Sequence, residues 1–149
     1  MKFLLDEMLN ARTAATMRTL GSEDGDDYVY LLEHDSGLGG TSDEGIPPIC
    51  KAGGFDALIT ANHKDFAARK VLWLALIEAG THLLVLRPKK QKFTVDLQVS
   101  FLARFRHHTR EAFAAGNGAG VLVVVSEGAM RTRTIEQLIA EVEGETRLP

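Results

Sequence analysis

Short apolar runs alternate along the chain with longer segments of helical periodicity. The runs are bounded by glycine, proline or charged residues, which is typical of buried strands. They predict strands at residues 2–5, 28–32, 55–60, 82–86 and 120–125, with a return strand at 131–133.

The segments between these runs carry apolar residues at helical spacing. In the first of them, Leu9, Ala14, Met17 and Leu20 can share one face, and Gly21 supplies a C-terminal stop. The same pattern predicts helices at residues 9–20, 43–52, 66–79, 94–115 and 135–142. Strands that are apolar throughout must be covered on both sides. The sequence therefore predicts an α/β fold, a mostly parallel central sheet flanked by helices on both faces.

The composition of the chain indicates its size class and its cellular compartment. The 149 residues suit one domain, and the hydrophobic (45%) and charged (25%) fractions are ordinary for a globular protein. A single cysteine, Cys50, excludes an internal disulfide and favours a reducing environment. No apolar run is long enough to span a bilayer, and the first run is interrupted at once by Asp6 and Glu7, unlike a signal peptide. We therefore expect a cytoplasmic protein without membrane association.

Polar residues gather after the first and third predicted strands, where open parallel sheets bind ligands. The candidates are, in chain order, Asp6, Glu7, Asp43, Glu44, Asn62 and Asp65. Converging carboxylates repel one another unless a cation or a proton lies between them, and oxygen ligands favour Mg²⁺ or Mn²⁺ over zinc. Such a cluster predicts metal-assisted hydrolysis of a phosphodiester.

Each acid also has a purely structural interpretation. Asp6 and Asp65 could cap the helices that follow them, and Asp43 and Glu44 could simply complement a helix dipole. The acids of residues 24–27 are expected to be solvated surface groups.

Three stretches resemble a known family. Residues 1–9 (a strand ending in Asp-Glu), 37–46 (a Gly-rich loop before Ser-Asp-Glu) and 58–66 (Thr-x-Asn-x-x-Asp-Phe) are similar, in this order, to bacterial PIN-like proteins. The third stretch resembles the signature of PIN-domain toxins of the VapC type. The likeness covers residues 1–92 of one PIN-like domain, with residues 93–149 as a C-terminal helix, strand and helix extension.

The resemblance implies a metal-dependent endoribonuclease that uses Mg²⁺ or Mn²⁺, often the toxin of a toxin–antitoxin pair. A cognate antitoxin and a homodimer are the partners it implies. The residues that match the metal-binding and catalytic acids are Asp6, Asp43 and Asp65. Thr60 and Asn62 match the signature as supporting residues. The family usually has a further acid on an early helix, which is not evident here, and Glu7 or Glu44 is the candidate substitute.

Basic residues are concentrated between positions 87 and 110, whereas acids dominate positions 23–44. Arg87, Lys89, Lys90 and Lys92 follow the fourth predicted strand, at the same sheet edge as the acids. They are candidates for contacts to RNA phosphates, although a solvated surface would carry the same charges.

Two other functions compete with the ribonuclease. The missing early-helix acid favours a non-catalytic PIN-like module that binds RNA or a protein partner. A phospho-receiver-like domain would need an acceptor aspartate at the end of the third strand, where Thr60 stands.

Overall fold

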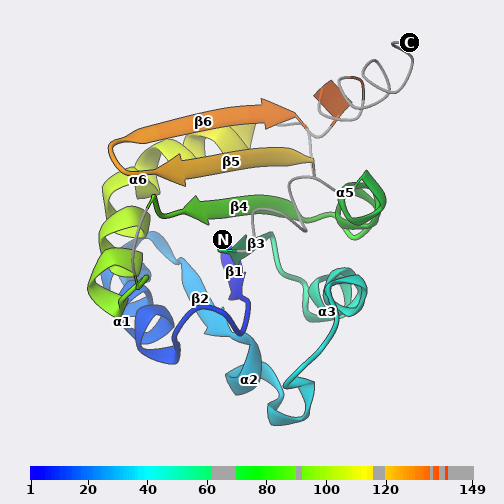
Figure 1. Cartoon of the computed structure of the whole chain (residues 1–149), viewed down its shortest axis with the longest axis horizontal. Coiled ribbons are helices and arrows are strands. Elements are labelled where there is room, and N and C mark those ends of the chain that lie inside the picture. Colours follow the sequence, from blue (N-terminus) through cyan, green and yellow to red (C-terminus); the bar gives the residue numbers. More distant parts are fainter. Residues whose placement is uncertain (62–69, 90–91, 116–119, 135, 138–139, 141–149) are drawn as a thin grey trace.

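The computed structural model describes residues 1–61, 70–89, 92–115, 120–134, 136–137 and 140 (Figure 1). These residues contain a six-stranded sheet in the order β2-β1-β3-β4-β5-β6. Strands β1 to β5 are parallel and β6 runs antiparallel to β5. The strands are β1 (Lys2–Leu5), β2 (Asp27–Tyr30), β3 (Ala57–Thr60), β4 (His82–Arg87), β5 (Val121–Ser126) and β6 (Ala129–Thr134).

Helices lie on both faces of this sheet. Helices α1 and α6 pack together on one face, and α3 and α5 pack together on the other (Figure 1). The described helices are α1 (Ala11–Gly21), α2 (Leu31–His34), α3 (Ile46–Gly53), α5 (Lys70–Glu78) and α6 (Val95–Ala115). The expected α/β architecture is confirmed. Strands β5 and β6 belong to the same sheet as β1 to β4, and α6 packs against β4 and β5.

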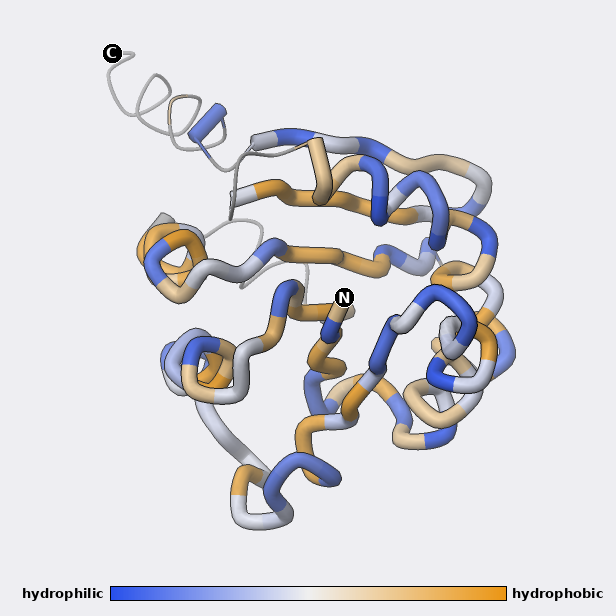
Figure 2. The backbone as a smooth tube through the Cα atoms, turned by 180° about the vertical axis from the view of Figure 1, so that it is seen from behind, coloured by the Kyte–Doolittle hydropathy of each residue, from blue (hydrophilic) through white to orange (hydrophobic). Residues whose placement is uncertain are grey.

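The apolar strands divide the core into two layers. Alternate residues of one strand point to opposite faces, so Leu84 packs toward α1 and α6 while Leu83 packs toward α3 and α5. Figure 2 shows β5 as hydrophobic along its length, whereas β6, at the edge of the sheet, is largely hydrophilic. Among the described residues, Cys50 and Trp73 belong to the layer under α3 and α5, as buried apolar side chains.

The end of β2 differs from the prediction. The strand stops at Tyr30, and Leu31–His34 forms a short helix instead of continuing the strand through residue 32. Its pairing partner β1 ends at Leu5, which lies opposite Tyr30, so no strand remains for residues 31 and 32 to pair with.

The buried face of α1 also differs from the prediction. Thr13, Ala14, Met17 and Gly21 are buried, but Leu20 is 49% exposed. Gly21 lies inside the helix and contacts the next loop, because a Cβ there would come within 2.9 Å of the Asp26 Cβ. Thr13, Met17 and Gly21 are four residues apart on the buried face, so Leu20, one residue before Gly21, lies about 100° away from that line.

The expectation that the acids of residues 24–27 are all solvated is wrong for Asp26. Its carboxylate is buried, and an oxygen lies 3.4 Å from Nε of Arg110. Arg106 pairs with Asp24 at 2.9 Å and donates to the Leu20 carbonyl at 2.8 Å. These two arginines tie α6 to the end of α1, which removes them from the positive surface expected over residues 87–110.

Within the described residues, no helix combines the length and the apolar character needed to cross a membrane.

Candidate functional site

The strand order places a crevice at the carboxyl ends of β1 and β3. These strands are neighbours in the sheet, but β2 lies beyond β1 on one side and β4 lies beyond β3 on the other. The chain therefore leaves the two strand ends in opposite directions, which is the arrangement that opens a ligand site in a doubly wound sheet.

Asp6 is the first residue after β1 and lies at this crevice. Its backbone N–H donates to the Ile59 carbonyl at 3.1 Å, which extends the pairing of β1 with β3 by one residue. One carboxylate oxygen accepts the Met8 backbone N–H at 2.8 Å, and the other accepts the Thr60 hydroxyl. Asp6 does not cap α1, because Asn10 performs that role by accepting the Arg12 backbone N–H.

The environment of Asp6 disfavours its charged form. Burial raises the pKa of the Asp6 carboxyl above its ordinary value, and the nearby charges of Asp43 and Glu7 raise it further. The hydrogen bonds from Thr60 and Met8 act in the opposite direction and stabilise the carboxylate. The Asp6 carboxylate is thus buried beside two other acids, while two hydrogen-bond donors hold it in place. A cation bound next to it would stabilise its charged form.

Glu7, the residue after Asp6, is held in place by the Gly-rich loop. Its Oε2 accepts the Gly40 backbone N–H at 3.0 Å. Gly40 has φ +74°, a left-handed conformation that side chains other than glycine rarely adopt. The glycine therefore lets the loop turn so that its N–H faces the Glu7 carboxylate.

A pocket of about 100 Å³ joins these acids. Asp6, Glu7 and Asp43 line it together with the apolar side chains of Leu31 and Ile46. Asp43 comes from the 3₁₀ turn Asp43–Gly45, which leads directly into α3. Pro47 and Pro48 fall in the first turn of α3, where the missing N–H groups cost little.

Glu44 lies apart from these acids. It lines a different pocket, of about 270 Å³, with Lys51 of α3 and Glu78 of α5. Of the two candidate substitutes for the missing helical acid, Glu7 is therefore the one that shares a pocket with Asp6.

Two of the sequence candidates, Asn62 and Asp65, lie outside the described residues. Within the part of the chain that is described, no group of three or more His, Cys, Asp or Glu side chains is arranged to hold a metal ion. Of the three acids in the predicted cluster, Asp6 and Asp43 line one pocket. The third, Asp65, is among the residues that the structure does not describe.

The candidate basic residues lie at the carboxyl end of β4. Arg87 is the last residue of that strand, and Arg87, Lys89 and Lys92 are exposed. Lys90 lies outside the described residues. Because β1, β3 and β4 are parallel, Arg87 is at the same sheet edge as Asp6 and Thr60.

Sequence reasoning missed Tyr30 as a neighbour of the site. Its hydroxyl donates to the Glu7 carbonyl at 3.0 Å, and burial, followed by the charges of Glu7 and Asp6, raises the pKa of its phenol. The sequence predicts a strand through residue 32, and this places the end of the strand two residues beyond Tyr30, where β2 ends. Cys50 is no candidate nucleophile, because burial raises the pKa of its thiol to about 12.

No family model matches the chain, and no curated protein or solved structure is found to be significantly similar to it.

Proposed function

We propose that the protein is a PIN-like, metal-dependent endoribonuclease whose reaction centre is the pocket between the ends of β1 and β3. The observation that carries this proposal is the environment of Asp6. A buried carboxylate is fixed by Thr60 and the Met8 N–H, and it faces Asp43 and Glu7 across a small pocket. Burying like charges together destabilises a fold, so a cluster of this kind indicates a functional site.

The donor set suits a hard divalent cation. Asp6 and Asp43 supply carboxylate oxygens, and such ligands favour Mg²⁺ or Mn²⁺. When bound, the ion would polarise a phosphate and lower the pKa of a water molecule. In this proposal Thr60 orients the Asp6 carboxylate, and Glu7, held by Gly40, takes the role of the acid absent from the early helix. Asp65 is the third metal-binding acid and Asn62 a supporting residue.

Substrate and partners follow from the same proposal. Arg87, Lys89, Lys90 and Lys92 contact RNA phosphates, which supply most of the affinity that does not depend on sequence. The family resemblance adds a cognate antitoxin and a homodimer to this proposal, and the single cysteine favours a cytoplasmic location.

The test is cleavage of a panel of RNAs by purified protein with Mn²⁺ or Mg²⁺. The wild type should cut, EDTA should abolish cutting, and Asp6→Asn and Asp43→Asn should each be inactive. Thr60→Val keeps both carboxylates and should lose about 10- to 100-fold in activity, as partners of metal ligands do. Asp96→Asn, which removes an exposed carboxylate of α6, is the control. An intact RNA panel with the wild type and Mn²⁺ would refute the nuclease.

A second candidate is a non-catalytic PIN-like module that binds RNA or a protein partner. It is favoured by the absence of an acid from the first turn of α1. This module predicts RNA binding that is equal in Mn²⁺ and in EDTA, without cleavage. The phospho-receiver alternative is not supported, because β3 ends at Thr60 where that function needs an aspartate.

A further inference from the structure

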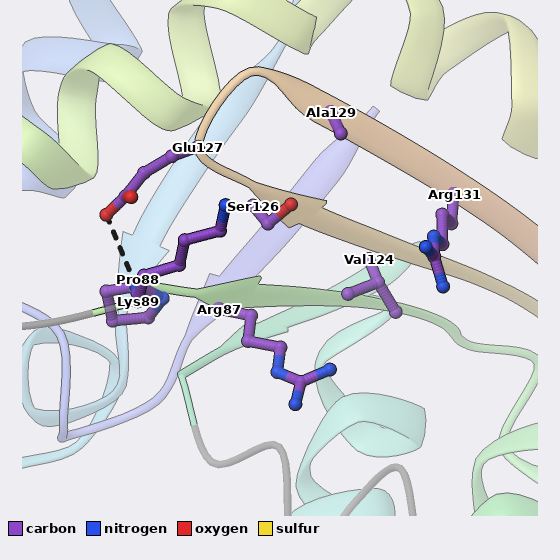
Figure 3. Close-up of a pocket in the computed structure, with 8 residues that line it drawn as sticks. All are labelled: Arg87, Pro88, Lys89, Val124, Ser126, Glu127, Ala129 and Arg131. Carbon is purple, nitrogen blue, oxygen red and sulfur yellow. Dashed lines mark hydrogen bonds between the residues drawn. The ribbon is translucent and has the colours of Figure 1, made fainter.

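A second pocket, of about 570 Å³, lies between the end of β4 and the β5–β6 hairpin (Figure 3). Its volume is in the range of ligand sites in proteins, about 300–1,000 Å³. Arg87 lines it from the end of β4 and Lys89 from the segment just after that strand. Ser126 and Glu127 line it from the end of β5 and its turn, and Arg131 from β6. Of these lining residues, the sequence predicts only Arg87 and Lys89 as contacts to RNA.

The strand register explains why these side chains share one face. Arg87 lies opposite Ser126, and Val124 lies opposite Arg131. Residues two apart in a strand point to the same face, so Val124 and Ser126 place Arg87 and Arg131 on a common side of the sheet. Figure 3 shows both guanidinium groups on the same side as Val124, with the Lys89 side chain extending toward Ser126.

The pocket is predominantly cationic. Arg87, Lys89 and Arg131 are exposed, and none of them forms a side-chain ion pair among the described residues. Among the described residues of the lining, Glu127 is the one with a carboxylate, and it accepts the Lys89 backbone N–H at 3.2 Å. Three cations and a hydroxyl against one carboxylate favour an anionic ligand with several phosphate oxygens.

The same register places this pocket relative to Asp6. Leu4, Leu58 and Leu83 are aligned across β1, β3 and β4, so Asp6, Thr60 and Val85 fall on the next row of the same face. Arg87 is one row further out and two strands along from Asp6. Ordinary strand and residue spacings put the two Cα atoms roughly 12 Å apart. An RNA strand of a few nucleotides can extend from one pocket to the other.

We propose that this basic pocket binds backbone phosphates of the RNA strand whose scissile bond lies at Asp6 and Asp43, with Arg131 and Ser126 of the hairpin opposite Arg87 and Lys89. The inference rests on the proposed nuclease function and deepens it. It assigns the β5–β6 hairpin to substrate binding. It also gives the RNA strand a path from β1 to β6, along the carboxyl ends of the parallel strands.

The test measures binding rather than cleavage, so that the two proposals can fail separately. A fluorescent single-stranded RNA is titrated in EDTA at several salt concentrations. Its length of about 12 nucleotides is within the site sizes of proteins that bind single-stranded nucleic acids. Arg87→Ala and Arg131→Ala should each weaken binding about three- to tenfold at 0.1 M salt. Each should also reduce the slope of log K against log salt by about 0.7.

Two further variants control for charge. Arg104→Ala removes an equal charge from an exposed position on α6 and should leave binding and slope unchanged. Glu127→Gln keeps the acceptor for the Lys89 N–H but removes the negative charge, so it should bind RNA more tightly. The thermal unfolding midpoint of each variant should equal that of the wild type, because all four positions are exposed.

Wild-type affinity in Arg131→Ala would overturn the inference, whatever the cleavage assay shows. Equal affinity for a single nucleoside monophosphate and for the oligonucleotide would also overturn it, in favour of a free-nucleotide site. Arg131-dependent binding in a protein that does not cut RNA with Mn²⁺ would support the pocket while refuting the nuclease.

Discussion

Asp6 combines features that oppose each other in the folded protein. The residue is 6% exposed, and its carboxylate is close to the charges of Asp43 and Glu7, yet Thr60 and Met8 donate hydrogen bonds to it. The unfolded chain would solvate the same carboxylate fully, so the raised pKa means that the charge of Asp6 destabilises the metal-free fold at neutral pH. A residue that lowers stability at a strand end is typical of functional sites.

Asp6→Asn should therefore stabilise the metal-free protein. The amide keeps an acceptor for the Met8 N–H, and the Thr60 hydroxyl can turn to accept from the new NH₂ group. We expect the thermal unfolding midpoint in EDTA to rise by roughly 3 °C, as about 1 kcal/mol does in a domain of this size. Differential scanning calorimetry measures it, with Asp96→Asn as the control. A lower midpoint for Asp6→Asn would show that its charge is compensated in the apo fold.

His82 predicts an acid sensitivity that is independent of the site. Its ring is buried against Phe113 at a centroid distance of 4.6 Å, and its Nδ1 accepts the Val121 backbone N–H at 3.3 Å. Burial lowers the pKa of His82 below its ordinary 6.5, and Asp56 acts weakly in the opposite direction. Only the unfolded chain then takes up a proton as the pH falls through 6.5, so stability decreases from that pH downward.

Urea unfolding between pH 7 and pH 5 measures this effect. The free energy of unfolding should fall by about 1.4 kcal/mol for each unit that separates the folded and unfolded pKa values. Asp6 contributes with the opposite sign, because its raised pKa makes stability increase as the pH falls. The His82 contribution is therefore the difference in pH slope between wild type and His82→Gln. An equal slope in both would contradict it, and exposed His108→Gln is the matched control.

At the scale of elements, one buried side chain joins the two helices of the same face. Oε1 of Gln98, in α6, accepts the Thr13 hydroxyl at 2.6 Å and the Asn10 backbone N–H at 3.1 Å, both at the start of α1. Its Nε2 donates to the Phe93 carbonyl at 2.7 Å. Gln98 is buried, so no water replaces these partners when the side chain is removed.

Gln98→Leu should destabilise the protein by about 2 kcal/mol, because it leaves the Asn10 N–H and the Thr13 hydroxyl without an acceptor. Chemical denaturation measures the change. Ser100→Ala, at an exposed position of the same helix, should be within 0.5 kcal/mol of wild type, roughly as surface substitutions are. A Gln98→Leu variant as stable as wild type would show that α1 and α6 are held by apolar packing alone.

The elements that the sequence predicted best are the buried parallel strands. In β1, β4 and β5 nearly every residue is apolar, because both faces of the sheet are covered, and the runs stand out against their flanks. Boundaries set by a partner strand were harder. Residues 28–32 form one uninterrupted apolar run, and the end of β1 at Leu5 decides where β2 stops.

The sequence could predict those residues of the candidate site that directly follow or precede a predicted strand or helix. Asp6 follows an unmistakable strand, and Asp43 precedes a helix that two prolines mark. Three features depend on contacts between distant segments, which the sequence does not display. They are the Gly40 bond to Glu7, the separation of Glu44 from Asp6, and the burial of Asp26 beside Arg110.

At the scale of the whole molecule, the acidic pocket and the basic pocket lie along one edge of the sheet, at the carboxyl ends of its parallel strands. Of the described residues, the acids Asp6 and Glu7 follow β1 and Asp43 precedes α3, and the basic pocket lies at the ends of β4, β5 and β6. The opposite face of the sheet is occupied by α1 and α6, and Arg106 of α6 pairs with Asp24 in the turn that follows α1. Substrate is therefore expected on the side of α3 and α5.

The central claim is that Asp6 and Asp43 form a divalent cation site, and Mn²⁺ binding followed by electron paramagnetic resonance tests it most directly. Wild-type protein should remove one equivalent of Mn²⁺ from solution. Asp6→Asn and Asp43→Asn should each abolish or strongly weaken that binding, while Asp96→Asn binds as the wild type does. Absence of Mn²⁺ binding by the wild type, or binding that survives both site substitutions, would contradict the account.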